Sequence, residues 1–157
     1  MSSNEKQAVG IAYDDAWLVD GCRTGFGAFS GTLADISATD LGIAVTKALF
    51  NKGAVSSVDI DNVFTASLAP SDFDAFYLPR HISLYSGVGQ HVPVMQLQRL
   101  CGSGFELVTQ ASRLLAVGKS PLRSRRWGRV HVSQPGCQFY QPWRIQTGTG
   151  GFPRLPD

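Results

Sequence analysis

The sequence predicts an α/β fold, built in layers around a mostly parallel sheet. Short apolar stretches rich in β-forming residues alternate along the chain with longer segments whose apolar residues recur at helical spacing. Alternation of this kind places helices on the faces of a sheet. Hydrophobic residues make up 43% of the 157 residues and charged residues 17%, which suits one globular domain with a sizeable core.

The first half of the chain contains two predicted strands with a helix between them. Trp17–Asp20 is a short apolar run, and Ile60–Ala66 alternates as a strand does. Between them, Thr39 or Asp40 can cap a helix that Gly53 stops. The apolar residues of that helix fall on one face: Leu41, Ala44, Val45, Ala48 and Leu49.

The second half repeats the order of helix and strand. Pro79 must lie in the first turn of a helix, because an interior proline would cost about 3 kcal/mol. We therefore expect a helix over Leu78–Tyr85. Val92–Leu97 predicts a third strand, and a last helix should run from Cys101 to Val117.

Cysteine usage favours a reducing compartment. The chain has three cysteines, an odd number without paired spacing, so we expect no disulfide framework and a cytoplasmic location. The first residues lack the charged and then apolar pattern of a signal peptide, and no run is long enough to span a membrane. We expect neither a membrane nor a nucleic acid as partner.

Cys101 is the residue with the strongest chemical signal. An apolar stretch leads into it, and a helical pattern follows, so the thiol is predicted at the first turn of a helix. Backbone N–H groups and the positive end of the helix dipole stabilise a thiolate there. Position alone leaves a second interpretation open, since isolated cysteines are commonly small buried hydrophobic residues.

The run Gln98–Phe105, which reads QRLCGSGF, resembles the segment that carries the nucleophile in the thiolase family. Four further blocks resemble thiolase segments in the same order: Arg23–Gly27, Ala38–Gly42, Val58–Val63 and Tyr77–His81. Together they cover about Trp17 to Lys119. In the first block, Gly25 stands where thiolases carry proline, so that loop should be looser.

This resemblance implies an incomplete fold, the N-terminal half of a thiolase. It implies that Cys101 is the nucleophile, which forms an acyl-thioester, with acyl-CoA and CoA as substrates and no separate cofactor or metal. Gly102 and Gly104 would allow close packing beside it. The family also implies a homo-oligomer and a helix after Cys101 that is buried between two layers.

The groups that would activate the nucleophile are not in the sequence. Thiolases carry them in Asn-Glu-Ala-Phe, Gly-His-Pro and Cys-x-Gly segments of their C-terminal half, and none occurs here. His81 is expected to be a packing or surface residue, and His91 precedes a Val-Pro turn. Cys22 and Cys137 are expected to be structural or accidental. The chain alone is therefore expected to be inactive.

A basic, irregular tail over residues 120–157 follows the partial thiolase domain of residues 1–119. From Lys119 onward seven cations accompany one anion, whereas the rest of the chain has seven cations and eleven anions. The tail can be disordered, or a basic arm for nucleic acid. We favour a third interpretation, a reading frame that shifts near Ser120, which leaves a sheet of about three strands with an open edge.

The genetic code supports the shifted frame. Reading Arg123–Val132 from the second base of each codon permits Ala-Leu-Ala-Gly-Gly-Ala-Glu-Ser-Met-Ser. That string resembles the strand and turn that follow the nucleophile helix in thiolases. The shift can be genuine or an artefact of sequencing, and the nucleotide sequence distinguishes these from an unshifted tail.

Three functions remain open at this point. The first is thiolase-type acyl transfer between Cys101 and coenzyme A, in 3-ketoacyl-CoA thiolysis or acetoacetyl-CoA formation. The second is a truncated fragment without catalysis, or a half that binds a partner. The third is a redox thiol, which the absence of a resolving cysteine at short spacing disfavours.

Overall fold

A computed structural model describes residues 12–13, 16–68, 74–117, 129–133 and 143–146. Its strands are β1 (Trp17–Gly21), β2 (Asn62–Ala66), β3 (Val94–Leu97), β4 (Arg129–Ser133) and β5 (Trp143–Gln146). Its α-helices are α1 (Ala38–Asn51), α2 (Leu78–Tyr85) and α3 (Ser103–Ala116). Short 3-10 turns span Ser57–Asp59, Ala75–Tyr77 and Leu100–Gly102.

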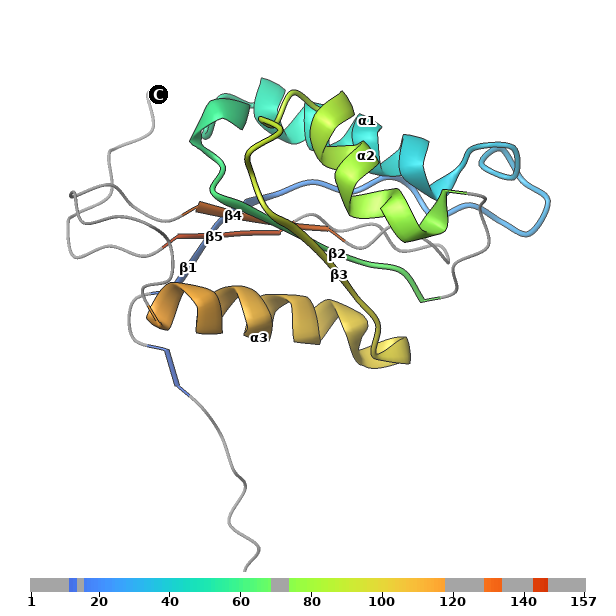
Figure 1. Cartoon of the computed structure of the whole chain (residues 1–157). Coiled ribbons are helices and arrows are strands. Elements are labelled where there is room, and N and C mark those ends of the chain that lie inside the picture. The colour runs from blue at the N-terminus through green and yellow to red at the C-terminus, as the bar shows by residue number, and fades with distance from the viewer. Residues whose placement is uncertain (1–11, 14–15, 69–73, 118–128, 134–142, 147–157) are drawn as a thin grey trace, which may run out of the picture.

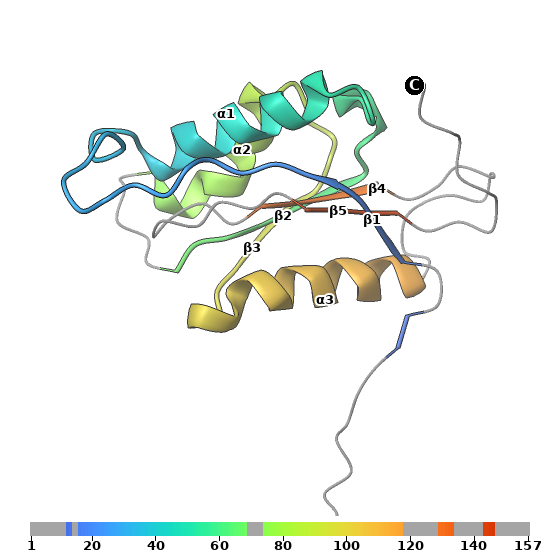
Figure 2. The same cartoon turned by 180° about the vertical axis from the view of Figure 1, so that it is seen from behind.

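The elements form three layers around one sheet. Helices α1 and α2 pack against each other on one face, and α3 lies on the other face against β2, β4 and β5 (Figure 1). The view from behind shows the same arrangement (Figure 2). The predicted layered α/β class is confirmed.

The sheet has the strand order β1-β5-β4-β2-β3. Strand β2 pairs in parallel with both β3 and β4, which confirms the predicted parallel pairing. Strand β5 is antiparallel to β1 and to β4. This half of the sheet was not predicted.

The expectation of three strands with an open edge beside β2 is wrong. Strand β4 occupies that edge, with Val63 opposite His131, and β5 extends the sheet to β1. Both strands lie in the predicted irregular tail. Their sequences, RVHVS and WRIQ, alternate between polar and apolar residues, which is the period of a strand and was overlooked.

The local signals around α1 and α2 mostly hold. Helix α2 covers the predicted residues, with Pro79 in its first turn, where its missing N–H costs nothing. Helix α1 ends at the predicted place, where Gly53 adopts a φ of +79°. Its cap is Ser37, whose hydroxyl accepts from the N–H of Asp40 at 3.0 Å, and not Thr39 or Asp40.

Alternating side chains of β2 supply both faces of the sheet. Phe64 and Ala66 pack with Leu107, Ala111 and Leu115 of α3. Val63, which precedes Phe64, belongs to a second cluster on the opposite face, with Val55, Ile60, Val88 and Val92. The core therefore lies on both sides of β2, which fixes the position of α3 and of the turn that precedes it.

Helix α3 is buried on one face only, so the expectation that it lies between two layers is wrong for this chain. Its buried residues Leu107, Ala111 and Leu115 recur every four positions. Phe105 points away from this face and is 82% exposed. Within the described residues, no layer covers that outer surface (Figures 1 and 2).

Candidate active site at the turn before α3

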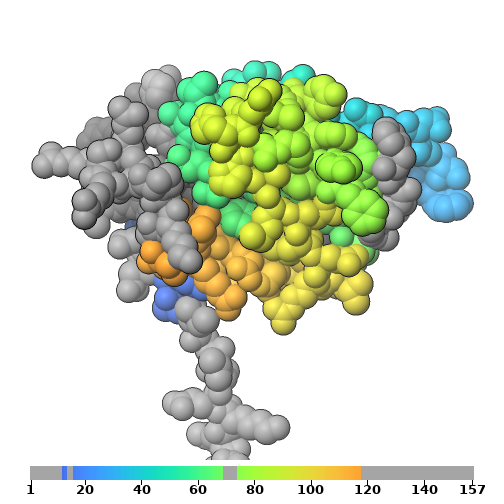
Figure 3. Space-filling view, viewed as in Figure 1, coloured from blue at the N-terminus to red at the C-terminus, as the bar shows by residue number. Residues whose placement is uncertain are grey.

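Cys101 lies between β3 and α3. It is the middle residue of the 3-10 turn Leu100–Gly102, and α3 begins at Ser103. The thiol therefore immediately precedes the first turn of the α-helix, one step earlier than predicted. Cys101 is exposed and is not part of a disulfide. The yellow segment that contains it reaches the surface of the molecule (Figure 3). The interpretation as a buried hydrophobic residue is wrong.

The residue before Cys101 has an unusual backbone. Leu100 has a φ of 47°, one of two positive values at non-glycine positions in the described residues. For a leucine this conformation costs on the order of 1–3 kcal/mol and persists only where its surroundings enforce it. Leu100 is also 65% exposed, so burial of its side chain does not supply the compensation.

Hydrogen bonds of Ser103 span the turn. The Ser103 hydroxyl accepts from the N–H of Arg99 at 2.8 Å and donates to the carbonyl of Leu100 at 2.7 Å. The N–H of Ser103 donates to the same carbonyl, and the N–H of Gly102 donates to the carbonyl of Arg99 at 3.0 Å. Sequence analysis did not assign this serine a role, because the turn it closes is irregular.

Gly102 leaves the helix end open. It occupies the N-cap position of α3 and has no side chain that could accept hydrogen bonds from the first turn. A methyl group built on Gly102 would meet no atom within 4 Å. Cys101 therefore immediately precedes the positive end of the helix dipole, and open space lies beside its neighbour Gly102.

The charged residues around the turn are paired. Nη1 of Arg99 lies 2.5 Å from Oε2 of Glu106, and the amide of Gln110 donates to Oε1 of Glu106 at 2.6 Å. The hydrogen bond from Gln110, followed by that from Arg99, lowers the pKa of Glu106 below its ordinary value. A carboxylate with a lowered pKa is a poor base, so Glu106 is not suited to deprotonate Cys101.

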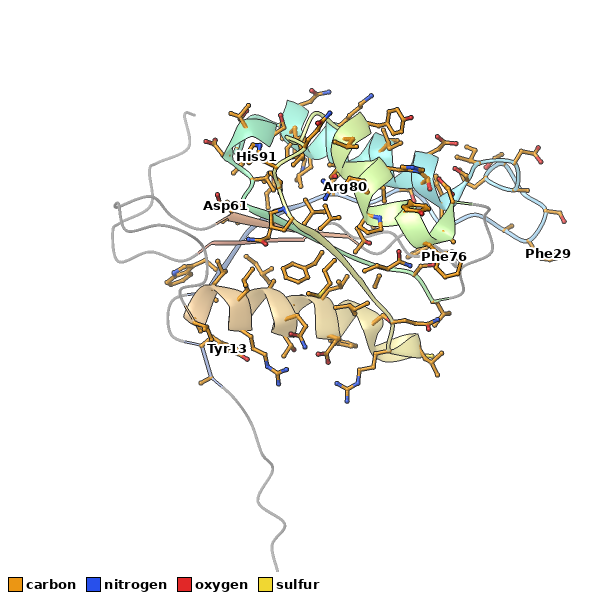
Figure 4. The ribbon with its side chains drawn as sticks, in the orientation of Figure 1. Tyr13, Phe29, Asp61, Phe76, Arg80 and His91 are labelled. Atoms are coloured by element: carbon orange, nitrogen blue, oxygen red, sulfur yellow. The ribbon has the colours of Figure 1, made fainter. Side chains whose placement is uncertain are left out.

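His81 and His91 lie away from Cys101. His81 lies on α2, and the sheet separates α2 from α3 (Figure 1). His91 precedes β3, whereas Cys101 follows it, so the strand separates the two (Figure 4). Cys22 lies beyond β1 and is half-buried. His131 belongs to β4, and Cys137 lies outside the described residues.

A second polar cluster, missed by sequence analysis, joins α1 to α2. Oδ2 of Asp74 accepts from the Thr39 hydroxyl at 3.0 Å and lies 2.9 Å from Nδ1 of His81. The hydrogen bond with His81 is the main cause that lowers the pKa of Asp74. Tyr77 stacks on the His81 ring, and Tyr85 contacts it edge-on. No sequence signal links Thr39 with Asp74, which lie 35 positions apart.

Hydrogen bonds also hold both ends of β3, the strand that leads to the turn. Arg80, on α2, reaches toward the segment before β3 (Figure 4), where its Nη1 donates to the carbonyls of Gln90 and Val92 at 3.2 and 3.1 Å. After β3, the Gln98 side chain donates to the carbonyl of Leu68. Both ends of β3 are thereby attached to neighbouring segments.

The described part of the chain contains no group of three or more His, Cys, Asp or Glu side chains that could hold a metal ion. It also contains no helix with the length and apolar character needed to cross a membrane.

Comparison with known proteins identifies the domain. The profile of the thiolase N-terminal domain matches residues 16–122. The human mitochondrial 3-ketoacyl-CoA thiolase is 38% identical over 101 residues, which are 64% of this chain and 25% of that protein. The beta-ketothiolase of Cupriavidus necator is 30% identical over 135 residues, which are 86% of this chain and 34% of that protein.

Solved structures of thiolases are also similar to this chain. The crystal structure of human mitochondrial 3-ketoacyl-CoA thiolase matches with a TM-score of 0.68 and 33% identity, over 76% of this chain and 28% of that one. The same human enzyme in complex with CoA matches equally well. The chain thus spans about a quarter to a third of the relatives it matches. It belongs to the thiolase family and matches an N-terminal portion of it.

Proposed function

We propose that Cys101 accepts an acyl group from a coenzyme A thioester. The thiolate adds to the thioester carbonyl, the bond from that carbon to the CoA sulfur breaks, and CoA leaves as a thiolate. An acyl-thioester then remains on Cys101. In thiolysis, the thiolate instead adds to the 3-keto carbonyl of a 3-ketoacyl-CoA. The bond between C2 and C3 breaks, and a proton donor converts the acetyl-CoA carbanion into acetyl-CoA.

One observation carries this proposal. Within a thiolase N-terminal domain, Cys101 is an exposed thiol at an uncapped helix N-terminus, with free space beside Gly102. The crystal structure of the human relative with CoA supports coenzyme A as the substrate group. Coenzyme A thioesters are substrates here, and we propose no additional cofactor.

We further propose that the isolated chain acylates without turning over. Glu106 is a poor base, and His81 and His91 lie away from Cys101. The sequence also lacks the thiolase segments that carry the activating groups. A chain that presents the thiol without a base should accept about one acyl group and then stop.

A second candidate function is that of a non-catalytic fragment or of a half that binds a partner. The observation in its favour is the apolar surface next to Cys101, where Leu100 is 65% and Phe105 82% exposed. Association into a homo-oligomer would cover such a surface. Size-exclusion chromatography tests whether this surface drives association, and a well-behaved monomer at all concentrations would contradict that role. The acyl-transfer assay with Cys101→Ser separates a non-catalytic fragment from an acyltransferase.

The remaining assignments are proposals with their own support. The proposed division into a thiolase domain over residues 1–119 and a tail over residues 120–157 is supported by the family match, which ends at residue 122. Strands β4 and β5 of the second segment nevertheless belong to the same sheet as β1, β2 and β3. A cytoplasmic location is supported only by cysteine usage, and the human relative is named as mitochondrial. We propose neither nucleic acid nor membrane as a partner.

The test of the acyl transfer is a comparison of three chains. The wild type, Cys101→Ser and the matched control Cys22→Ser are incubated with acetoacetyl-CoA, with and without free CoA. We expect about one acetyl or acetoacetyl group per chain in the wild type and in Cys22→Ser, none in Cys101→Ser, and no steady-state thiolysis. Turnover that disappears in Cys101→Ser would overturn the expected inactivity. Equal acylation of all three chains would overturn the role of Cys101.

A further inference from the structure

Ser103 combines three properties that its position at the start of a helix does not require. Ser103 is fully buried, with 0% exposure, although Leu100 of the preceding turn is exposed. Its hydroxyl both accepts and donates a hydrogen bond within the preceding turn. It caps no N–H group of its own helix, which is the usual role of a serine near a helix start.

These hydrogen bonds surround the residue with the unusual backbone. Arg99 donates to the Ser103 hydroxyl from one side of Leu100, and the Leu100 carbonyl accepts from it on the other. These two hydrogen bonds are compatible with the φ of 47° at Leu100. They would be lost if Leu100 relaxed to an ordinary backbone conformation. Ser103 therefore provides the local contact that can hold Leu100 in this conformation.

We propose that Ser103 is a positioning residue for Cys101: its buried hydroxyl holds the strained turn at Leu100, and the turn keeps the thiol at the uncapped end of α3. The proposal rests on the proposed function of Cys101, which Ser103 serves without touching the reacting atoms. A relaxed turn would rotate the peptide between Leu100 and Cys101 and move the thiol away from the helix end.

The test measures the alkylation of Cys101 in the full chain. Second-order rate constants for iodoacetamide are measured by peptide mass spectrometry at one pH, with Cys22 in the same molecule as the internal reference. We expect Ser103→Ala to lower the rate at Cys101 by about tenfold, the effect of one to two lost hydrogen bonds, and to leave Cys22 unchanged. Ser103→Thr keeps the hydroxyl and should stay within about twofold of the wild type.

A matched control separates positioning from general stability. Ser112 is another buried serine of α3, at 6% exposure, and lies three turns away from Cys101. Ser112→Ala should leave the Cys101 rate unchanged, even where its melting temperature falls as far as that of Ser103→Ala. An equal loss of rate in both variants, or none in Ser103→Ala, would overturn the proposal.

A second background tests the link to Leu100. Glycine adopts a positive φ without strain, so Leu100→Gly should form the turn without help from Ser103. In that background we expect Ser103→Ala to change the Cys101 rate by less than about twofold. A tenfold loss of the Cys101 alkylation rate in the Leu100→Gly background would refute the proposed mechanism. The same comparison tests the proposal if the Ser103→Ala chain does not fold by itself. Since alkylation needs no CoA thioester, failure of the proposed acyl transfer would be seen separately.

Discussion

Replacing Asp74 by alanine removes a carboxylate that joins α1 to α2 through side chains. Its Oδ2 is shared by the Thr39 hydroxyl and by Nδ1 of His81. Asp74 is 8% and Thr39 6% exposed, so the substitution leaves a buried hydroxyl without its acceptor. We therefore expect a loss of stability well above that of a surface substitution.

The magnitude follows from the two contacts. Hydrogen bonds to a charged group contribute about 1.5–3 kcal/mol each. The side chain of His81 is 34% exposed, so its share has to be reduced for solvent screening. We expect Asp74→Ala to lower the free energy of unfolding by about 2–3 kcal/mol. Asp74→Asn, which keeps an acceptor but not the charge, should cost about half as much.

The assay is urea denaturation of both variants and the wild type across pH. Because the folded-state pKa of Asp74 lies below its ordinary value of 3.8, its ionisation stabilises the protein above that value. This contribution is lost as pH falls through the lower, folded-state pKa. The difference between wild type and Asp74→Ala in the free energy of unfolding should therefore shrink as pH falls from 3.8 toward the lower, folded-state pKa of Asp74.

Two results would refute this reasoning. The exposed Asp35 provides the matched control, and Asp35→Ala should change stability by less than about 0.5 kcal/mol. An effect of Asp74→Ala as small as that of Asp35→Ala would mean that the cluster is not formed in solution. A difference that grows as pH falls below 3.8 would mean that the pKa of Asp74 is raised on folding.

Further predictions concern the core, the surface and the attachment of β3. Leu107 is 1% exposed, so Leu107→Ala should lower the free energy of unfolding by about 2–5 kcal/mol in urea denaturation. A loss below about 1 kcal/mol would contradict the packing of α3 on β2. Phe105→Ser should change stability by less than about 0.5 kcal/mol but reduce self-association in sedimentation velocity, and unchanged association would exclude this surface as a contact. Arg80→Met removes two contacts with backbone carbonyls and should cost about 1–2 kcal/mol, whereas the exposed Arg23→Met should cost under about 0.5.

Local sequence signals predicted most of the elements between Trp17 and Val117. Pro79 fixed the start of α2, because a proline is tolerated only in the first turn, and Gly53 marked the end of α1 through its positive φ. Cys101 was placed within one residue of its position relative to α3. Each of these features depends on neighbours within a few positions in the chain.

What the sequence did not predict depends on long-range contacts or on irregular backbone. Strands β4 and β5 are short, and they are held in the sheet by long-range pairing, of β4 with β2 and of β5 with β4 and β1. The cluster of Asp74 with Thr39 brings together residues 35 positions apart. Phe29 lies at the tip of the loop before α1, away from the sheet, at 96% exposure (Figure 4), which hydrophobicity alone would not suggest.

The reading-frame hypothesis stays a prediction. Strands β4 and β5 lie within the segment that it assigns to a shifted frame, and the family match ends at residue 122. The nucleotide sequence from Lys119 onward decides it. A shifted frame that does not encode a segment like Gly-Gly-Ala-Glu-Ser-Met-Ser would exclude the hypothesis.

The role of Cys101 is tested most directly by a competition between thiols within one molecule. The chain is incubated with acetyl-CoA below saturation, quenched in acid and digested, and the acetyl group on each cysteine peptide is quantified over time. We predict that Cys101 is acetylated at least about tenfold faster than Cys22 and Cys137, as expected for a thiol at an open helix end with room for a carbonyl. Equal rates at the three cysteines, or faster labelling of Cys22 or Cys137, would contradict the assignment of Cys101 as the nucleophile.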